Sequence, residues 1–226
     1  RQEGRRMPDY SVVLTFDDGF RNFLTAALPR LKERAMPATV FLITDKLGEA
    51  EGGETADGWR EEDDFSYLSW AEARALREKH HVEFGSHTCS HSRLPSLSPE
   101  ETERELRDSL TELAEHLGVE RPSLSYPKGE HSEIIADQAR RLGYSCAVTT
   151  DRGANDPGQD LFTLGRTLVG DHDDEASFAV RVSGLREWLV RLCAVPYRIA
   201  RARRSAAPAV LHPARKLESG IDKFLT

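Results

Sequence analysis

Short apolar runs alternate with amphipathic stretches along most of the chain. The first run covers residues 12–16 and breaks off at Asp17, Asp18 and Gly19. An uninterrupted apolar run of this kind is typical of a strand that is buried on both faces. Further runs that predict strands lie at residues 38–43, 81–86, 123–126, 144–149 and 164–169.

Helices are expected between these runs, where apolar residues recur at spacings of three and four. They cover residues 20–35, 69–79, 98–118, 132–142 and 175–190. Two of them open with a capping box, at Ser69 to Glu72 and at Ser98 to Glu101. Pro29 either kinks the first helix or marks its true start. Polar, glycine-containing stretches predict loops at residues 44–66 and 150–160.

The order of strand followed by helix repeats about six times without hairpin signals, which indicates an α/β fold with a parallel sheet. Such a sheet is either a barrel or doubly wound. Polar motifs follow the first, third and fourth predicted strands. In a barrel these strand ends converge on one rim, where α/β folds carry their chemistry.

Two of these motifs offer ligands for a metal. Asp17 and Asp18 repel each other unless a cation, a proton or an arginine compensates. His87 and His91 follow the third strand. A catalytic zinc site needs about three protein ligands and an open position for water, so one Asp and two His would leave the other Asp as a base. Each motif alone also fits an ordinary turn or a surface pair.

The chain resembles the polysaccharide deacetylase family, carbohydrate esterase family 4, whose members carry the NodB homology domain. The resemblance rests on TFDDG at residues 15–19, SHTCSH at 86–91 and SYPKG at 125–129. It spans roughly residues 10–190, and it is nearest to the subgroup of poly-N-acetylglucosamine deacetylases. It implies a distorted (β/α) barrel of about six to seven βα units.

The resemblance also implies an activity, which is hydrolysis of an acetyl group, usually the N-acetyl group of N-acetylglucosamine in a polysaccharide. It implies that a divalent metal, zinc or else cobalt or nickel, is bound by Asp18, His87 and His91, and that Asp17 is the general base. The third motif would contact the substrate, and the backbone N–H of one of its residues would hold the oxyanion. The residues expected to bind substrate are Tyr126, Pro127, Lys128 and Gly129.

Three departures from the family pattern bear on catalysis. The arginine that orients the base in the family is replaced by Ser125. Arg166 is the candidate to pair with Asp17 instead; the alternative is that Arg166 is an ordinary surface residue. Lys128 stands where the family commonly has an aromatic residue, which favours a glycan that is anionic or partly different from the usual substrate of the family. The histidine that protonates the leaving amine in the family is missing after the fifth strand. The poly-N-acetylglucosamine deacetylases carry this histidine on a strand before the first motif, and this chain would then lack that strand. His131, on a rim loop, is a candidate for substrate contact or a surface residue.

Composition sets the remaining expectations. The net charge of −7 argues against nucleic acid as a partner. The three cysteines show no paired spacing, and no apolar run reaches the ~18 residues of a membrane span. The resemblance implies a deacetylase domain over residues 1–190, and the excess of Lys and Arg over residues 191–226 marks a basic extension after it. The extension would contact an anionic membrane or polymer, or be merely flexible.

Rival functions stay open at this point. The same fold would serve an O-acetyl esterase, a cyclic amide hydrolase, or a glycan-binding module that has lost catalysis. The resemblance favours the cell envelope or the exterior of the cell, and the lack of a visible signal peptide leaves the cytoplasm as an alternative. The sequence does not indicate an oligomeric state.

Overall fold

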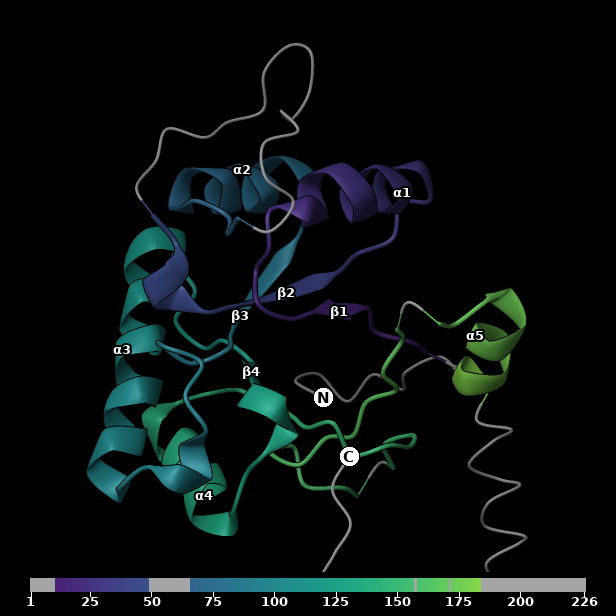
Figure 1. The fold of residues 1–226 in the computed structure, drawn as a ribbon. Coiled ribbons are helices and arrows are strands. Elements are labelled where there is room, and N and C mark those ends of the chain that lie inside the picture. The colour runs from purple at the N-terminus through teal and green to yellow at the C-terminus, as the bar shows by residue number, and fades with distance from the viewer. Residues whose placement is uncertain (1–10, 49–65, 157, 171, 184–226) are drawn as a thin grey trace, which may run out of the picture. The chain divides into compact units, whose positions relative to one another are not determined.

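Five parallel strands in sequential order form the centre of the computed structural model (Figure 1). The structure describes residues 11–48, 66–156, 158–170 and 172–183. The strands are β1 (Thr15–Phe16), β2 (Thr39–Leu42), β3 (Glu83–Ser86), β4 (Leu124–Ser125) and β5 (Ala147–Val148). Each strand pairs with the one before it, as in a barrel, whereas a doubly wound sheet reverses its order at a switch point. The sheet is a curled half-barrel, which confirms the predicted fold class.

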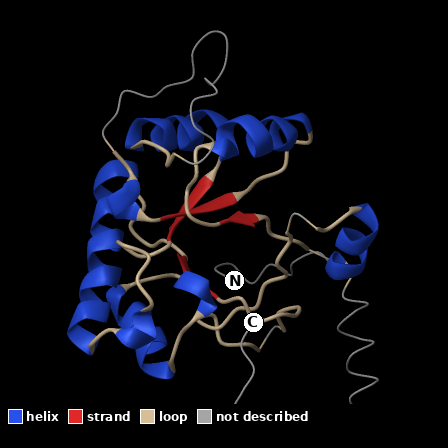
Figure 2. Ribbon diagram, viewed as in Figure 1, coloured by secondary structure: helices blue, strands red, loops and turns tan. Residues whose placement is uncertain are grey.

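Most helices pack along the outside of this sheet, and the last one lies to the side of it (Figure 2). They are α1 (Leu28–Glu33), α2 (Trp70–His80), α3 (Pro99–Leu117), α4 (Glu133–Leu142) and α5 (Glu175–Val182). No helix in the described ranges is long and apolar enough to span a membrane.

Local sequence signals set the starts of α2 and α3 and the ends of α3 and α4 where they were predicted. At the start of α2, Ser69 accepts a hydrogen bond from the Glu72 backbone N–H, and the Glu72 carboxylate accepts one from the Ser69 N–H. Ser98 caps α3 in the same way. Gly118 and Gly143 follow α3 and α4 in the left-handed conformation that ends a helix.

The core consists of two clusters between the strands and the helices. One contains β2 and β3 residues such as Leu42 and Phe84 under α2. The other contains Leu124 and Tyr126 under α3 and α4. Because successive side chains of a strand point to opposite faces, the residues between these core positions point away from the helices. That inner face carries the polar residues described below.

Several predicted boundaries are wrong. The first strand was expected to be buried on both faces, but Val12 and Val13 are 58% and 69% exposed. The reason is that β1 contains only Thr15 and Phe16, so Val12 and Val13 lie before the strand and outside the sheet. The strand predicted from residue 81 begins at Glu83, because His81 ends α2 in a left-handed conformation.

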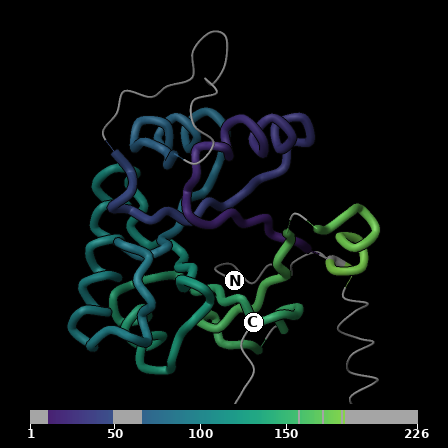
Figure 3. The backbone as a smooth tube through the Cα atoms, viewed as in Figure 1, coloured from purple at the N-terminus to yellow at the C-terminus, as the bar shows by residue number. Residues whose placement is uncertain are grey.

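The predicted sixth strand, residues 164–169, is reduced to a single parallel bridge between Leu164 and Val148. Leu168 and Val169 are 47% and 57% exposed, so the apolar run does not continue into the core. This late segment nevertheless returns to the edge of β1, as the tube in Figure 3 shows.

The first predicted helix is divided. A π-helical turn over Phe23–Ala27 precedes α1, and Pro29 lies in the first turn of α1. Pro29 therefore marks the start of the α-helix proper, where its missing N–H costs nothing. The predicted domain boundary at residue 190, the basic extension over 191–226 and most of the loop at 44–66 lie outside the described residues.

Candidate active site

The turn after β1 presents two carboxylates. Asp18 and Gly19 have φ angles of 71° and 74°, so the chain reverses sharply directly after Asp17. A side chain at position 19 would come within 2.7 Å of Leu42. Asp is one of the few residues other than Gly that adopts the left-handed conformation readily. The Leu68 N–H donates to the Gly19 carbonyl at 2.9 Å and holds the turn in place.

Two histidines follow β3. His87 is buried, and its Nδ1 lies 2.7 Å from the Ser125 carbonyl oxygen. A carbonyl only accepts, so Nδ1 carries the proton and the Nε2 lone pair is available as a ligand. Burial lowers the pKa of His87 and outweighs the opposing effect of Asp17, which favours the neutral ring that binds metals. His91 has a φ of 64°, and its N–H donates to Thr88 Oγ1 at 3.1 Å.

Asp18, His87 and His91 fit a divalent metal. Asp18 Oδ1 lies 3.5 Å from His87 Nε2 and 3.7 Å from His91 Nε2. Ligand bonds of about 2.0–2.1 Å at tetrahedral angles place donor atoms about 3.3–3.4 Å apart, so small adjustments would close the site around an ion. Among the described residues, this is the one group of three Asp, Glu, His or Cys with ligand atoms within 4.8 Å of one another.

Asp17 lies next to this group but forms a different contact. Arg166 donates from Nη1 to Asp17 Oδ1 and from Nη2 to Asp17 Oδ2, each at 2.8 Å. Ser125 Oγ donates to Asp17 Oδ2 at 3.3 Å. Burial raises the pKa of Asp17, but the hydrogen bonds and charge of Arg166, together with the hydrogen bond from Ser125, bring it below its ordinary value. Asp17 is therefore an oriented, ionised carboxylate at neutral pH.

Arg166 is anchored on several sides. Its Nε donates to the Thr149 carbonyl at 2.9 Å, and Nη1 also donates to Thr15 Oγ1 at 3.2 Å. Its guanidinium lies 5.9 Å from the centre of the Phe41 ring. The sequence left two alternatives for Arg166, a pair with Asp17 or an ordinary surface position. The structure contains the pair with Asp17.

The third motif divides between the two faces of β4. Ser125 points to Asp17, and Nη2 of Arg166 donates to its hydroxyl at 3.1 Å. Tyr126 is 0% exposed and donates from its hydroxyl to the Phe162 carbonyl at 3.1 Å, so its ring supports the core and is not available to a substrate. Pro127 is also buried, whereas Lys128 is exposed.

The backbone of this loop is tightly constrained. Lys128 and Gly129 have φ angles of 58° and 74°. A Cβ at position 129 would overlap Thr150, so the loop needs glycine there. The Gly129 N–H donates to the Tyr126 carbonyl at 2.8 Å. The turn leaves the Lys128 backbone at the end of β4, on the rim that also carries Asp17 and His87.

His131 lies elsewhere. Its ring stacks on Tyr126, with ring centres 5.2 Å apart and planes 15° apart. Tyr126 belongs to the core cluster beneath α3 and α4, so this contact places His131 on the side of β4 opposite Ser125. Within the described ranges, the histidines grouped with Asp18 are His87 and His91.

The sequence did not indicate that Ser125 has a role in the site; there it marked only the loss of an arginine. The hydroxyl bridges Asp17 and Arg166, and the carbonyl orients His87. The alternation of Ser125 and core-facing Tyr126 along β4 is the signal that would have indicated this.

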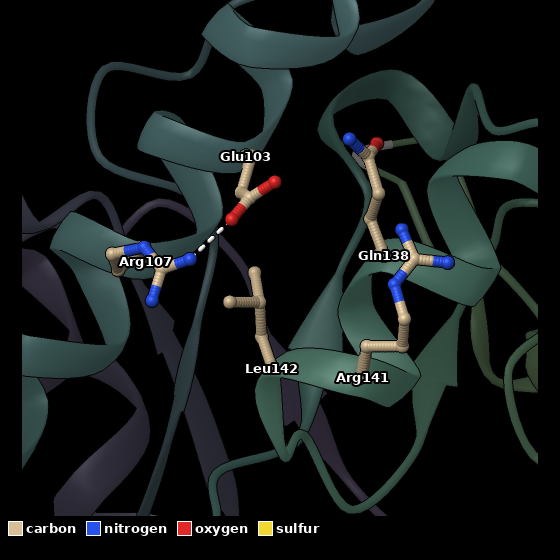
Figure 4. A pocket seen from close by; sticks show the side chains of 5 residues that line it. All are labelled: Glu103, Arg107, Gln138, Arg141 and Leu142. Atoms are coloured by element: carbon tan, nitrogen blue, oxygen red, sulfur yellow. Dashed lines mark hydrogen bonds and ion pairs between the residues drawn. The ribbon is translucent and has the colours of Figure 1, made fainter.

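A hollow of about 250 Å³ lies between α3 and α4 and is shown in Figure 4. It is lined by Glu103, Arg107, Gln138, Arg141 and Leu142, and it contains none of the residues above. Glu103 pairs with Arg107, as the dashed line in Figure 4 shows, and Gln138 donates to the Pro99 carbonyl at 2.8 Å. The hollow is therefore a feature of helix packing, separate from the candidate site.

Comparison with known proteins agrees with this geometry. The family model described as polysaccharide deacetylase matches residues 4–147. The chain belongs to the polysaccharide deacetylase family. This confirms the resemblance read from the three motifs, and the deacetylases of this family are metal-dependent.

Individual relatives are distant. YxkH of Bacillus subtilis, named as a member of the same family, is 25% identical over 184 residues, which are 81% of this chain and 60% of the relative. The poly-β-1,6-N-acetyl-D-glucosamine N-deacetylase of Escherichia coli K12 is 25% identical over 211 residues, which are 81% of this chain and 31% of the relative. The chain thus spans less than two thirds of either protein.

A solved structure shares the fold. The deacetylase PplD of Streptococcus pyogenes, determined in complex with acetate, superposes with a TM-score of 0.68 at 23% identity. The match covers 80% of this chain and 74% of PplD.

Proposed function

We propose that this chain is a metal-dependent N-deacetylase of a polysaccharide that contains N-acetylglucosamine-type residues. The observation that carries the proposal is the arrangement of two different carboxylates at the end of β1. Asp18 faces His87 and His91, whereas Asp17 is held by Arg166. One group is suited to bind a cation and the other to accept a proton.

Asp18, His87 and His91 would hold the ion, with zinc, cobalt and nickel all compatible with one oxygen and two nitrogen ligands. Such an ion supplies Lewis-acid chemistry, because it lowers the pKa of water and polarises a carbonyl. The Ser125 carbonyl keeps the Nε2 of His87 free of a proton, as metal binding requires.

Asp17 is the residue proposed to take the proton from the attacking water. Its Oδ2 lies 3.9 Å from His87 Nε2, which places it beside the ligand group without belonging to it. Arg166 and Ser125 keep the carboxylate ionised and fix its direction, as a general base requires.

The Lys128 backbone N–H is proposed to donate to the oxyanion that forms when water adds to the acetyl carbonyl. A backbone donor in a constrained turn loses little order during the reaction. Tyr126 and Pro127, both buried, would contribute by fixing this turn, and Gly129 by allowing it.

The proposed bond is an amide. The name of the Escherichia coli relative supports this choice, because that protein is a poly-β-1,6-N-acetyl-D-glucosamine N-deacetylase. Acetate release should be measured on β-1,6-linked N-acetylglucosamine oligomers and, side by side, on O-acetylated glycans. Zinc-loaded protein is expected to release acetate from the amide substrate, and chelator-treated protein to lose this activity until zinc is restored. Release from O-acetyl esters alone would overturn the assignment of the bond.

A further inference from the structure

The segment that carries Arg166 is held to β5 by backbone hydrogen bonds on one side only. Both backbone groups of Leu164 bond to the β5 segment. The Leu164 N–H donates to the Ala147 carbonyl at 3.1 Å, and the Leu164 carbonyl accepts from the Thr149 N–H at 2.8 Å. The next residue, Gly165, directs its N–H and carbonyl to the opposite side, as alternation along a strand requires. These two groups form the outer edge of the sheet at this point.

Asn155 occupies that edge with a single side chain. Its Nδ2 donates to the Gly165 carbonyl at 3.0 Å, and its Oδ1 accepts from the Gly165 N–H at 2.8 Å. The carboxamide thus replaces the peptide group of a neighbouring strand. It satisfies both backbone groups of the residue directly before Arg166.

The position of Gly165 is closely defined on its other sides as well. A Cβ there would lie 2.7 Å from the Asp151 carbonyl oxygen. That same carbonyl accepts the Arg166 N–H at 2.8 Å. Leu168 and Val169, just beyond, are 47% and 57% exposed, so core packing does not fix the segment there.

We infer that Asn155 is a positioning residue for the reaction: by bracketing Gly165, it sets the backbone from which Arg166 reaches Asp17. This inference rests on the proposed function, in which Arg166 orients the base. It adds a group from the loop at residues 150–160 that no motif of the family resemblance includes. Because the Asn155 side chain is exposed, its role is geometric more than energetic.

The test compares Asn155→Ala with Gln159→Ala. Gln159 is a matched control, because it is a carboxamide of the same loop whose Nε2 donates to the Thr163 carbonyl at 2.7 Å in the same returning segment. Misplacing a catalytic group costs up to roughly 100-fold, so we expect Asn155→Ala to lower kcat about tenfold while KM stays within about twofold. Gln159→Ala should leave both within about twofold.

Two further measurements separate positioning from a general structural role. In an Arg166→Met background, Asn155→Ala should lower kcat no further, because the group it positions is gone. Asn155→Asp keeps the acceptor for the Gly165 N–H but turns a carboxylate towards the Gly165 carbonyl, so it should behave like Asn155→Ala. Equal losses in Asn155→Ala and Gln159→Ala, or full additivity with Arg166→Met, would overturn the inference.

A readout independent of turnover keeps this test separate from the proposed function. The Arg166 Nε–H, bonded to the Thr149 carbonyl, should give a protected guanidinium signal in the NMR spectrum of the wild-type chain and of Gln159→Ala. Asn155→Ala is expected to lose that signal. Its persistence there would refute the role of Asn155 even if the chain released no acetate, whereas its loss together with an inactive wild type would refute only the proposed function.

Discussion

Replacing Arg166 by methionine removes the partner of Asp17 while keeping much of the arginine's apolar stem. In the structure the Arg166 side chain is 11% exposed and the Asp17 side chain 29% exposed. Two charge-assisted hydrogen bonds of 2.8 Å join them. Neutral acceptors at Thr149, Thr15 and Ser125 complete the arginine's contacts.

The size of the effect follows from burial. Removing one partner of a buried ion pair costs about 3–5 kcal/mol because a charge is left uncompensated. Asp17 keeps some access to water, so about 2–3 kcal/mol is the better figure, in line with hydrogen bonds to charged groups. For a chain of this size this corresponds to a fall in Tm of about 5–10 °C.

The pH dependence has a definite sign. The folded-state pKa of Asp17 lies below its ordinary value, so this carboxylate contributes stability above that value and loses the contribution as pH falls through the folded pKa. The difference in stability between wild type and Arg166→Met should therefore be full at neutral pH and shrink below about pH 4. Thermal and urea unfolding in the presence of a chelator would measure it without a contribution from bound metal.

Arg93→Met is the matched control. Arg93 forms an equally well-aligned pair with Glu130, at 2.9 and 2.8 Å, but the arginine is 60% exposed. Exposed pairs contribute little, so Tm should hardly change. Equal shifts for Arg93→Met and Arg166→Met, or no loss of acetate release in Arg166→Met, would refute the reasoning.

Three other substitutions test separate parts of the fold. In Gly85→Ala the new methyl would lie 2.6 Å from the Phe41 ring, which supports Arg166. Overpacking of about 1–3 kcal/mol should lower both Tm and turnover. An unchanged turnover would contradict the role of Phe41 in supporting Arg166. Tyr144→Phe removes a buried hydroxyl that donates to the Leu106 carbonyl at 2.8 Å, so urea unfolding should show a loss of about 1–1.5 kcal/mol with activity retained. Ser98→Ala removes a helix cap and should cost about 1 kcal/mol in the same assay, again without loss of acetate release.

Local signals account for what the sequence predicted well. Capping boxes involve residues three apart, so Ser69 and Ser98 could be assigned without knowledge of the tertiary structure. The meeting of Asp18 with His87 and His91 was predictable because parallel strands end on the same rim. Both inferences depend on short-range patterns combined with a general rule of α/β folds.

The errors occur where distant segments decide the outcome. An apolar run at residues 12–16 does not reveal that only Thr15 and Phe16 pair with β2, which leaves Val12 and Val13 exposed. The pairing of Arg166 with Asp17, predicted beside the alternative of a surface arginine, is present, but it spans 149 positions and no local pattern could decide between the two alternatives. The motif residue Tyr126 was expected at the substrate, but strand alternation turns its ring into the core.

The central claim is that two adjacent carboxylates have different tasks, and one comparison tests it most directly. Bound zinc and acetate release from N-acetylglucosamine oligomers should be measured on wild type, Asp17→Asn and His87→Ala. Asp17→Asn is expected to bind zinc as wild type does and to release no measurable acetate, whereas His87→Ala should lose both zinc and activity. Full acetate release by Asp17→Asn, or full zinc binding by His87→Ala, would contradict the division of roles between Asp17 and Asp18.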